Sequence, residues 1–137
     1  MPHLEPSTLY QHQADATLSQ ANPVSATLYT VLDTTPNVRV ISIAVSVVWT
    51  VQPTPLEIVV TIDGQTIIWT FTNPATGTDY YAGVKAAFTP TTQPLDVNDL
   101  ALYRAFLLEG RSVKIEARTT GGTVSALYAK VKYAKIP

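Results

Sequence analysis

"RTTGGTVSALYAKVKY", residues 118–133, places a glycine pair between two segments in which apolar and polar side chains alternate. Alternation of this kind is typical of β-strands with one buried face. A two-residue loop at the glycines would mix the apolar and charged faces, because a shift of one residue turns every side chain over. A three-residue loop over 120–122 pairs Ile115 with Leu127 and keeps the apolar side chains together. The stretch therefore predicts an antiparallel hairpin with one dry face.

The opposite face of this hairpin is basic. It carries Lys114, Glu116, Arg118, Tyr128, Lys130 and Lys132. Residues 111–137 hold six basic side chains and one acidic one, whereas residues 1–110 hold three and nine. Clustered basic and aromatic residues suit nucleic acid, but outward lysines on an edge strand also prevent sheet aggregation. Because the formal net charge of the whole chain is −1, we favour edge protection or a contact with another subunit.

A second hairpin is predicted over residues 55–73, "PLEIVVTIDGQTIIWTFTN". Asp63-Gly64 is a favoured two-residue turn pair. Counting outward from this turn predicts three pairs on one face and three on the other: Val60 with Ile67, Ile58 with Trp69, Leu56 with Phe71, Thr61 with Thr66, Val59 with Ile68 and Glu57 with Thr70. Apolar residues meet apolar residues on the first face, so the turn chemistry and the pattern agree.

The longest predicted strand is "VRVISIAVSVVWTV", residues 38–51. Its expected core face carries Ile41, Ile43, Val45, Val47, Trp49 and Val51. A strand of this length would span about 46 Å, so a bend, a bulge or a passage between sheets is expected within it. The other face holds small side chains, of which Ser42, Ala44 and Ser46 are the expected contacts with another sheet or subunit.

Three further segments complete the expected elements. Residues 24–33 and 79–88 are predicted as strands. The one helix candidate is "DVNDLALYRAFLLEG", residues 96–110, although its segment "LYRAFLL" also alternates as a strand would. Asp96 or Asn98 would cap this helix and Gly110 would end it. The prediction is an all-β chain, an antiparallel two-layer β-sandwich of jelly-roll or immunoglobulin-like type with at most one short helix.

The domain organisation follows from where the alternation begins. Residues 1–22 mix Pro, Gln, Ser and Ala without a sustained period, so we expect a flexible N-terminal arm followed by a β-sandwich domain over 23–137. Such an arm is either a disordered tail or a segment that orders on a neighbouring subunit.

Reactive side chains are few. The chain has no cysteine, and His3 and His12 lie nine residues apart in the expected arm without the tight spacing of metal ligands. The acidic residues have structural explanations, since Asp63 belongs to a turn and Asp96 and Asp99 to a helix start. We therefore expect no catalytic residue, no cofactor and no metal site, and hence no enzyme.

A glycan-binding or receptor-binding module is the alternative. Small β-sandwiches that bind carbohydrate use exposed aromatic side chains, and Tyr80, Tyr81, Tyr103 and Tyr128 are the candidates. Trp49 and Trp69 fall on expected core faces. Core packing is the commoner fate of strand aromatics, so this alternative ranks second.

Three stretches carry a resemblance to a known family: "TLYTVLDTTPNVRVISIAVSV" (27–47), "PLEIVVTIDGQTIIWTF" (55–71) and "LLEGRSVKIEARTTGGTVSALYAKVKY" (107–133). Together they resemble the small β-sandwich structural proteins of virions, such as capsid decoration, head-fibre or tail-associated proteins of tailed phages and similar viruses. The resemblance implies a non-enzymatic protein of the virus particle that is made in the host cytoplasm without a signal peptide. It further implies a homo-oligomer, a trimer or another ring, that contacts a capsid or tail protein. Nucleic acid is not expected as a partner because the chain as a whole is slightly acidic, and membrane is not expected because no apolar run reaches the length of a membrane span.

Overall fold

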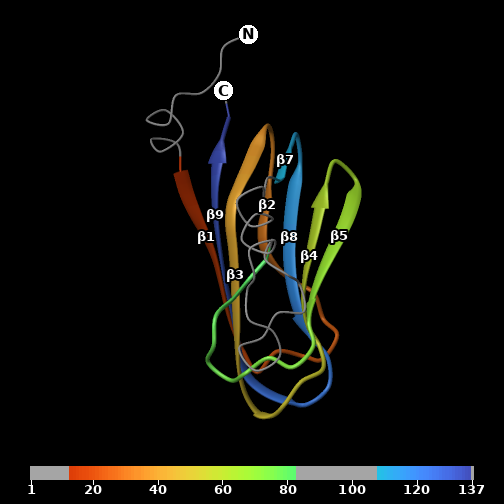
Figure 1. The fold of residues 1–137 in the computed structure, drawn as a ribbon. Coiled ribbons are helices and arrows are strands. Elements are labelled where there is room, and N and C mark those ends of the chain that lie inside the picture. The colour runs from red at the N-terminus through yellow and green to blue at the C-terminus, as the bar shows by residue number, and fades with distance from the viewer. Residues whose placement is uncertain (1–12, 83–107, 137) are drawn as a thin grey trace, which may run out of the picture.

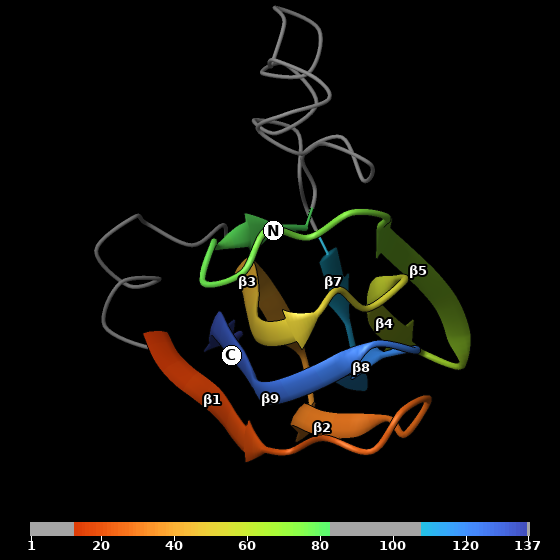
Figure 2. The same cartoon turned by 90° about the horizontal axis from the view of Figure 1, so that it is seen from below.

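The computed structural model describes residues 13–82 and 108–136. These residues form nine strands in two antiparallel sheets, with no helix among them. Sheet I has the order β1 (Gln13–Ala21), β9 (Thr123–Lys135), β3 (Val38–Val51) and β6 (Tyr80–Tyr81), and β7 (Leu108–Gly110) also pairs with β3. Sheet II has the order β2 (Tyr29–Thr34), β8 (Val113–Thr119), β4 (Leu56–Ile62) and β5 (Gln65–Phe71). The strands run along the length of the molecule (Figure 1), and the two layers face each other (Figure 2). The predicted β-sandwich is confirmed.

The strand order is that of a jelly roll. Strands β1 and β3 belong to sheet I while β2 and β4 belong to sheet II, and β6 and β7 take the same position beside β3. An immunoglobulin-like sandwich keeps its first two strands in one sheet, whereas a jelly roll joins eight strand positions in two Greek keys. Of the two expected topologies, the structure has the jelly roll.

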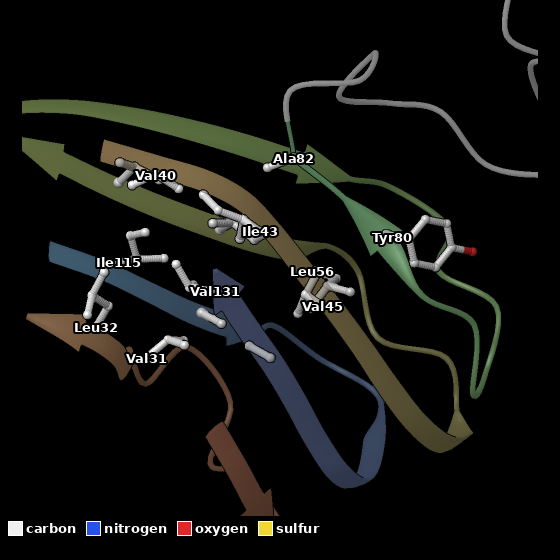
Figure 3. Close-up of a cluster of buried hydrophobic side chains, with 14 of the residues drawn as sticks. Val31, Leu32, Val40, Ile43, Val45, Leu56, Tyr80, Ala82, Ile115 and Val131 are labelled. Atoms are coloured by element: carbon white, nitrogen blue, oxygen red, sulfur yellow. The ribbon is translucent and has the colours of Figure 1, made fainter. Parts of the chain in front are cut away.

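The core lies between the sheets and is almost entirely aliphatic (Figure 3). Ile43, Ile58 and Ile115 are each 1% exposed or less, and full burial of such a side chain stabilises a fold by about 1.5–3 kcal/mol. Phe71 of sheet II and Tyr80 of sheet I join the layers, with ring centroids 5.3 Å apart. The alternation in the sequence therefore produces one continuous apolar layer.

The predicted hairpin around the glycine pair is wrong. Strand β8 pairs with β2 and β4 in sheet II, whereas β9 pairs with β1 and β3 in sheet I. The glycines therefore form an arch that carries the chain from one sheet to the other. Ile115 and Leu127 are both buried, as expected, but they belong to opposite layers of the core. Alternation cannot separate a hairpin from an arch, because both turn the same side chains inward.

Backbone geometry explains the arch. Gly121 and Gly122 have φ of 69° and 67°, in the left-handed region that glycine enters without a steric penalty. A Cβ on Gly122 would lie 2.4 Å from the carbonyl oxygen of Val51. Thr54 N–H donates to the carbonyl of Thr120 at 2.7 Å, so the arch is tied to the end of β3 and the start of β4.

The hairpin over 55–73 is confirmed in every predicted pair, from Leu56 with Phe71 to Thr61 with Thr66. Asp63 and Gly64 have φ of 49° and 83°, as a primed two-residue turn requires.

Strand β3 contains the expected irregularity, and its position changes the core face. The register with β9 shifts between Val40 and Ser42, which leaves Ile41 without a partner. Val40 is therefore buried at 1% exposure and Ile41 is only half-buried, the reverse of the prediction. Further shifts follow Val48, and Val51, expected in the core, is 57% exposed.

The structure differs from the expectation in two further segments. Residues 13–21 were assigned to the arm, but they form the edge strand β1, because Ala16 and Leu18 pack against the core. Residues 108–110, the end of the expected helix, form β7 and pair with Val38–Val40 of β3. The expected helix over 96–107, the strand over 83–88 and the arm over 1–12 lie outside the described residues.

Adding a methyl group at each glycine of the arch tests its geometry. We expect Gly121→Ala to lower the free energy of unfolding by about 1–2 kcal/mol, because the nearest atom to its Cβ, Thr54 Oγ1, lies 3.8 Å away and only the left-handed backbone is penalised. Gly122→Ala should cost at least about 1 kcal/mol more, since its Cβ meets the backbone of Val51 and Gln52. Urea unfolding of both variants measures the difference, and equal losses would contradict this geometry.

Candidate functional site

The outer face of sheet I gathers six of the eight residues predicted to contact a partner. The register places Ser42 opposite Lys132, Ala44 opposite Lys130 and Ser46 opposite Tyr128. Strand β1 covers the other side of β9, with Thr17 and Ser19 opposite the same β9 residues. Tyr81 of β6 lies opposite Ala44 on the other side of β3, so four strands present one surface.

This surface is hollowed into a shallow trough of about 500 Å³. The residues whose side chains face it are Thr17, Ser19, Ser42, Ala44, Ser46, Asp79, Tyr81, Tyr128, Lys130 and Lys132. The hollow arises because the central strand β3 contributes only Ser and Ala here, while its neighbours contribute longer side chains. We call this surface the trough.

Two exposed tyrosines border the floor of the trough. Tyr81 of β6 lies opposite Ala44 and is 46% exposed, and Tyr128 of β9 lies opposite Ser46 and is 43% exposed. They stand on either side of β3, so their backbones are two strand spacings, roughly 10 Å, apart. An aromatic ring with a hydroxyl can both bury apolar area and form a hydrogen bond, which suits recognition of a partner surface.

Two lysines and an aspartate line the trough, and one of the lysines pairs with a further aspartate. Lys130 Nζ lies 3.6 Å from Asp15 Oδ2 in an exposed ion pair, whereas Lys132 has no ion-pair partner among the residues that the structure describes. Asp79 lies exposed at the rim. One ammonium group is therefore available to a carboxylate from outside.

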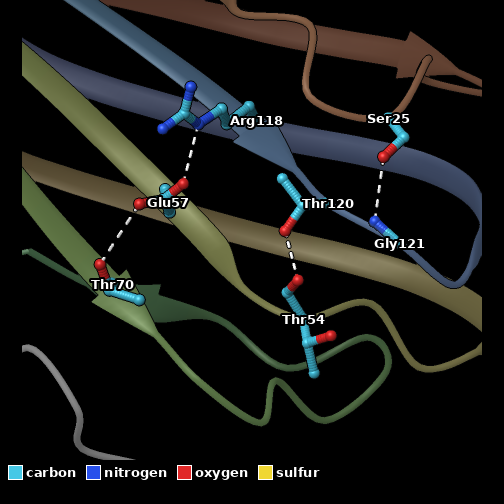
Figure 4. A network of polar contacts seen from close by, with 7 residues as sticks. All are labelled: Ser25, Thr54, Glu57, Thr70, Arg118, Thr120 and Gly121. Atoms are coloured by element: carbon cyan, nitrogen blue, oxygen red, sulfur yellow. Dashed lines mark hydrogen bonds and ion pairs between the residues drawn. The ribbon is translucent and has the colours of Figure 1, made fainter.

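Lys114 and Arg118, the other two predicted contacts, lie on the opposite side of the molecule. Because the arch sends β8 into sheet II, the expected continuous basic face is divided between two surfaces. Arg118 Nε donates to Glu57 Oε1 at 2.8 Å, and Thr70 Oγ1 donates to Glu57 Oε2 at 3.4 Å (Figure 4). This network ties β8, β4 and β5 together, so Arg118 has a structural role within sheet II.

Of the aromatic residues considered as binding candidates, some are accounted for by the fold and do not border the trough. Tyr80 is buried at 3% exposure, and its hydroxyl oxygen accepts a hydrogen bond from Ala75 N–H at 2.7 Å. Trp49 is half-buried against the core and donates through Nε1 to the carbonyl of Pro74 at 2.9 Å. Trp69 also packs half-buried against the core. Tyr103 lies outside the described residues.

Chemically, the trough offers hydroxyls, aromatic rings and ammonium groups. Within residues 13–82 and 108–136, no three His, Cys, Asp or Glu side chains are grouped so that they could hold a metal ion. No helix in those ranges is long and apolar enough to cross a membrane. His3, His12, Asp96 and Asp99 lie outside the described ranges. The described surface is therefore suited to binding.

Strand β1 contributes to this site, although the sequence pattern predicts an arm over residues 1–22. Thr17 and Ser19 of β1 form one wall of the trough. The available signal was the short alternation from Ala14 to Leu18, in which Ala14, Ala16 and Leu18 are the apolar members. Alanine is weakly apolar, so the pattern did not stand out.

No family model and no curated protein matches the chain. Among solved structures, it is similar to one from Bacillus described by the words "Bacillus endospore appendages form a novel family of disulfide-linked pili". The identity is 13%, the similarity covers 91% of this chain and 88% of that chain, and the TM-score is 0.48. Similarity this distant does not assign a function. The present sequence contains no cysteine, so the disulfide linkage of those pili has no counterpart in it.

Proposed function

We propose that this chain is a non-enzymatic structural subunit of a virus particle and that it assembles with copies of itself through the trough. The observation that carries the proposal is the construction of the sheet I outer face. Ser42, Ala44 and Ser46 form an uncharged floor of small side chains, bordered by Tyr81 and Tyr128.

A floor of this kind favours close packing against another protein. Small side chains let a neighbouring backbone or side chain approach the sheet, and they lose little conformational freedom when they are covered. Tyrosine is enriched among the residues that contribute most to protein interfaces, and charged residues are depleted from interface centres. Tyr81 and Tyr128 therefore serve as anchors, with Lys130 and Lys132 at the rim.

Electrostatics support another copy of the chain as the partner. Lys132 has no ion-pair partner among the described residues, and exposed Asp33 of β2 has none either. These two groups lie on different sheets, so a head-to-tail contact can bring the lysine of one copy to an acidic residue of the next. Closure of such contacts would give the expected ring.

Two observations support the assignment to a virus particle. They are the jelly-roll topology, which capsid proteins use, and the resemblance of residues 27–47, 55–71 and 107–133 to small virion proteins. A fold hosts many functions, so this step depends on imaging. Electron microscopy of the purified chain, alone and mixed with virus particles from its source, should show it bound to a capsid or tail.

Glycan binding is the second candidate, because Tyr81 and Tyr128 border a trough lined with hydroxyl groups. Exposed tyrosine rings can stack on sugar rings while serine and threonine side chains bind sugar hydroxyls. Self-assembly and glycan binding would use the same surface, so the same variant tests both.

Placing a long cation on the floor of the trough tests the proposal. We expect Ala44→Arg to raise the dissociation constant of the oligomer at least tenfold without lowering the melting temperature, because Ala44 faces outward. Thr30→Arg, on the exposed outer face of sheet II, is the matched control and should assemble normally. Light scattering after size exclusion gives the mass.

A monomeric wild-type chain that binds a glycan array, and loses that binding in Ala44→Arg, would replace the proposal by the second candidate. A monomer that binds no glycan would overturn both. Higher salt should also weaken the wild-type oligomer if Lys132 is used as proposed.

The segment before β1 has a separate role in the proposal. Residues 1–12 precede β1, the strand that forms one wall of the trough, and we propose that they contact a neighbouring subunit. Deletion of residues 1–12 should weaken assembly and leave the melting temperature unchanged, whereas deletion of 1–22 should also lower it, because β1 is lost. Scanning calorimetry and light scattering measure the two effects. Assembly of the shorter deletion at wild-type strength would refute the role of residues 1–12.

A further inference from the structure

Strand β5 is the last strand of sheet II, and its outer edge pairs with no described strand (Figure 1). The pair that flanks a two-residue turn exchanges both backbone hydrogen bonds, so Ile62 and Gln65 are bonded to each other. Alternation from that pair directs the backbone groups of Thr66, Ile68 and Thr70 away from β4. Their N–H and C=O groups have no backbone partner among the described residues.

The other sheet edges carry features that oppose pairing with a second chain. Strand β2 has a register shift between Thr30 and Leu32 and an acidic residue, Asp33. The strands β6 and β7 are two and three residues long. Strand β1 contains Asp15. Bulges, charges and short length are the devices that protect sheet edges.

Strand β5 has none of these devices. Its seven residues, "QTIIWTF", contain no charged residue and no proline, and they pair with β4 without a register shift. Ile67 and Ile68 are 41% and 48% exposed. An apolar and regular edge with no bulge, charge or proline is a template for another strand.

The sequence of β5 indicates that the strand that would pair with this edge is β5 of a second copy of the chain. Residues 66–70 read Thr-Ile-Ile-Trp-Thr, so they are nearly symmetric about Ile68. Antiparallel pairing of two copies about a two-fold axis at Ile68 sets Ile68 opposite the partner's Ile68 and Thr66 opposite the partner's Thr70. Ile67 then lies opposite the partner's Trp69. Pairs of threonine, β-branched and aromatic residues stabilise adjacent strands, and no like charges oppose each other.

We infer that two copies of this chain pair through β5 and join their sheets II into one continuous sheet of eight strands across a two-fold axis. The hydrogen bonds come from the outward groups of Thr66, Ile68 and Thr70. This contact lies on sheet II and is independent of the trough on sheet I, so one subunit would carry two different self-contacts.

The lack of cysteine allows a direct test, because a single introduced cysteine is the only thiol. In the inferred dimer the two Ile68 Cα atoms are about 5.5 Å apart, within the range of a disulfide. Ile68→Cys in the full chain should therefore give a covalent dimer on mild oxidation. Thr66→Cys is the matched control, because two copies of Thr66 are offset by four residues, about 14 Å, and should cross-link at least tenfold more slowly.

A second variant measures the contact without a cross-link. Ile68→Lys places two like charges opposite each other at the axis, and it should raise the dissociation constant of the β5 dimer at least tenfold in sedimentation equilibrium. Thr30→Lys, at the other edge of sheet II, should not. The Ile68→Cys cross-link should persist when Ala44→Arg is added, which separates this contact from the trough. Equal cross-linking at positions 66 and 68, or unchanged association of Ile68→Lys, would overturn the inference.

Discussion

Gly121 and Gly122 let the chain leave sheet II and enter sheet I between β8 and β9, and the sandwich depends on that crossing. The backbone at both positions is left-handed, and Gly122 lies against the backbone that connects β3 to β4. With the crossing in place, the apolar sides of β8 and β9 close on the core from opposite layers. The basic residues of these strands are then separated on two outer surfaces, and only those of β9 reach the trough.

Local features of the fold could be predicted from the sequence. The seven pairs of β4 with β5 follow from one turn and from alternation along both strands, and the sequence predicts six of them. The crossing between sheets could not be predicted in this way, because a hairpin and an arch bury the same side chains, Ile115 and Leu127 among them. The position of the bulge at Ile41 was also hidden, since either neighbour of a bulge can turn inward.

The candidate site also has a part that local sequence patterns predict and a part that depends on long-range pairing. Alternation predicts that Ser42, Ala44 and Ser46 share the outward face of one strand and that Tyr128, Lys130 and Lys132 share the outward face of another. The pairing of β3 with β9, which joins these two sets in the trough, could not be predicted from alternation. The contribution of β1 depends on a long-range pairing with β9 that weak local patterning does not reveal. The trough and the β5 edge lie on different sheets, so a single small domain offers two surfaces for assembly.

The most direct test of this account is the set of backbone NOEs that strand β8 makes in solution. In the arch, Ile115 pairs with Val60 of β4, and Leu127 pairs with Val47 of β3. The account predicts cross-strand backbone NOEs for both pairs and none between Ile115 and Leu127. Backbone NOEs between Ile115 and Leu127 would show that β8 and β9 form a hairpin in one sheet, and would contradict the separation of the two surfaces.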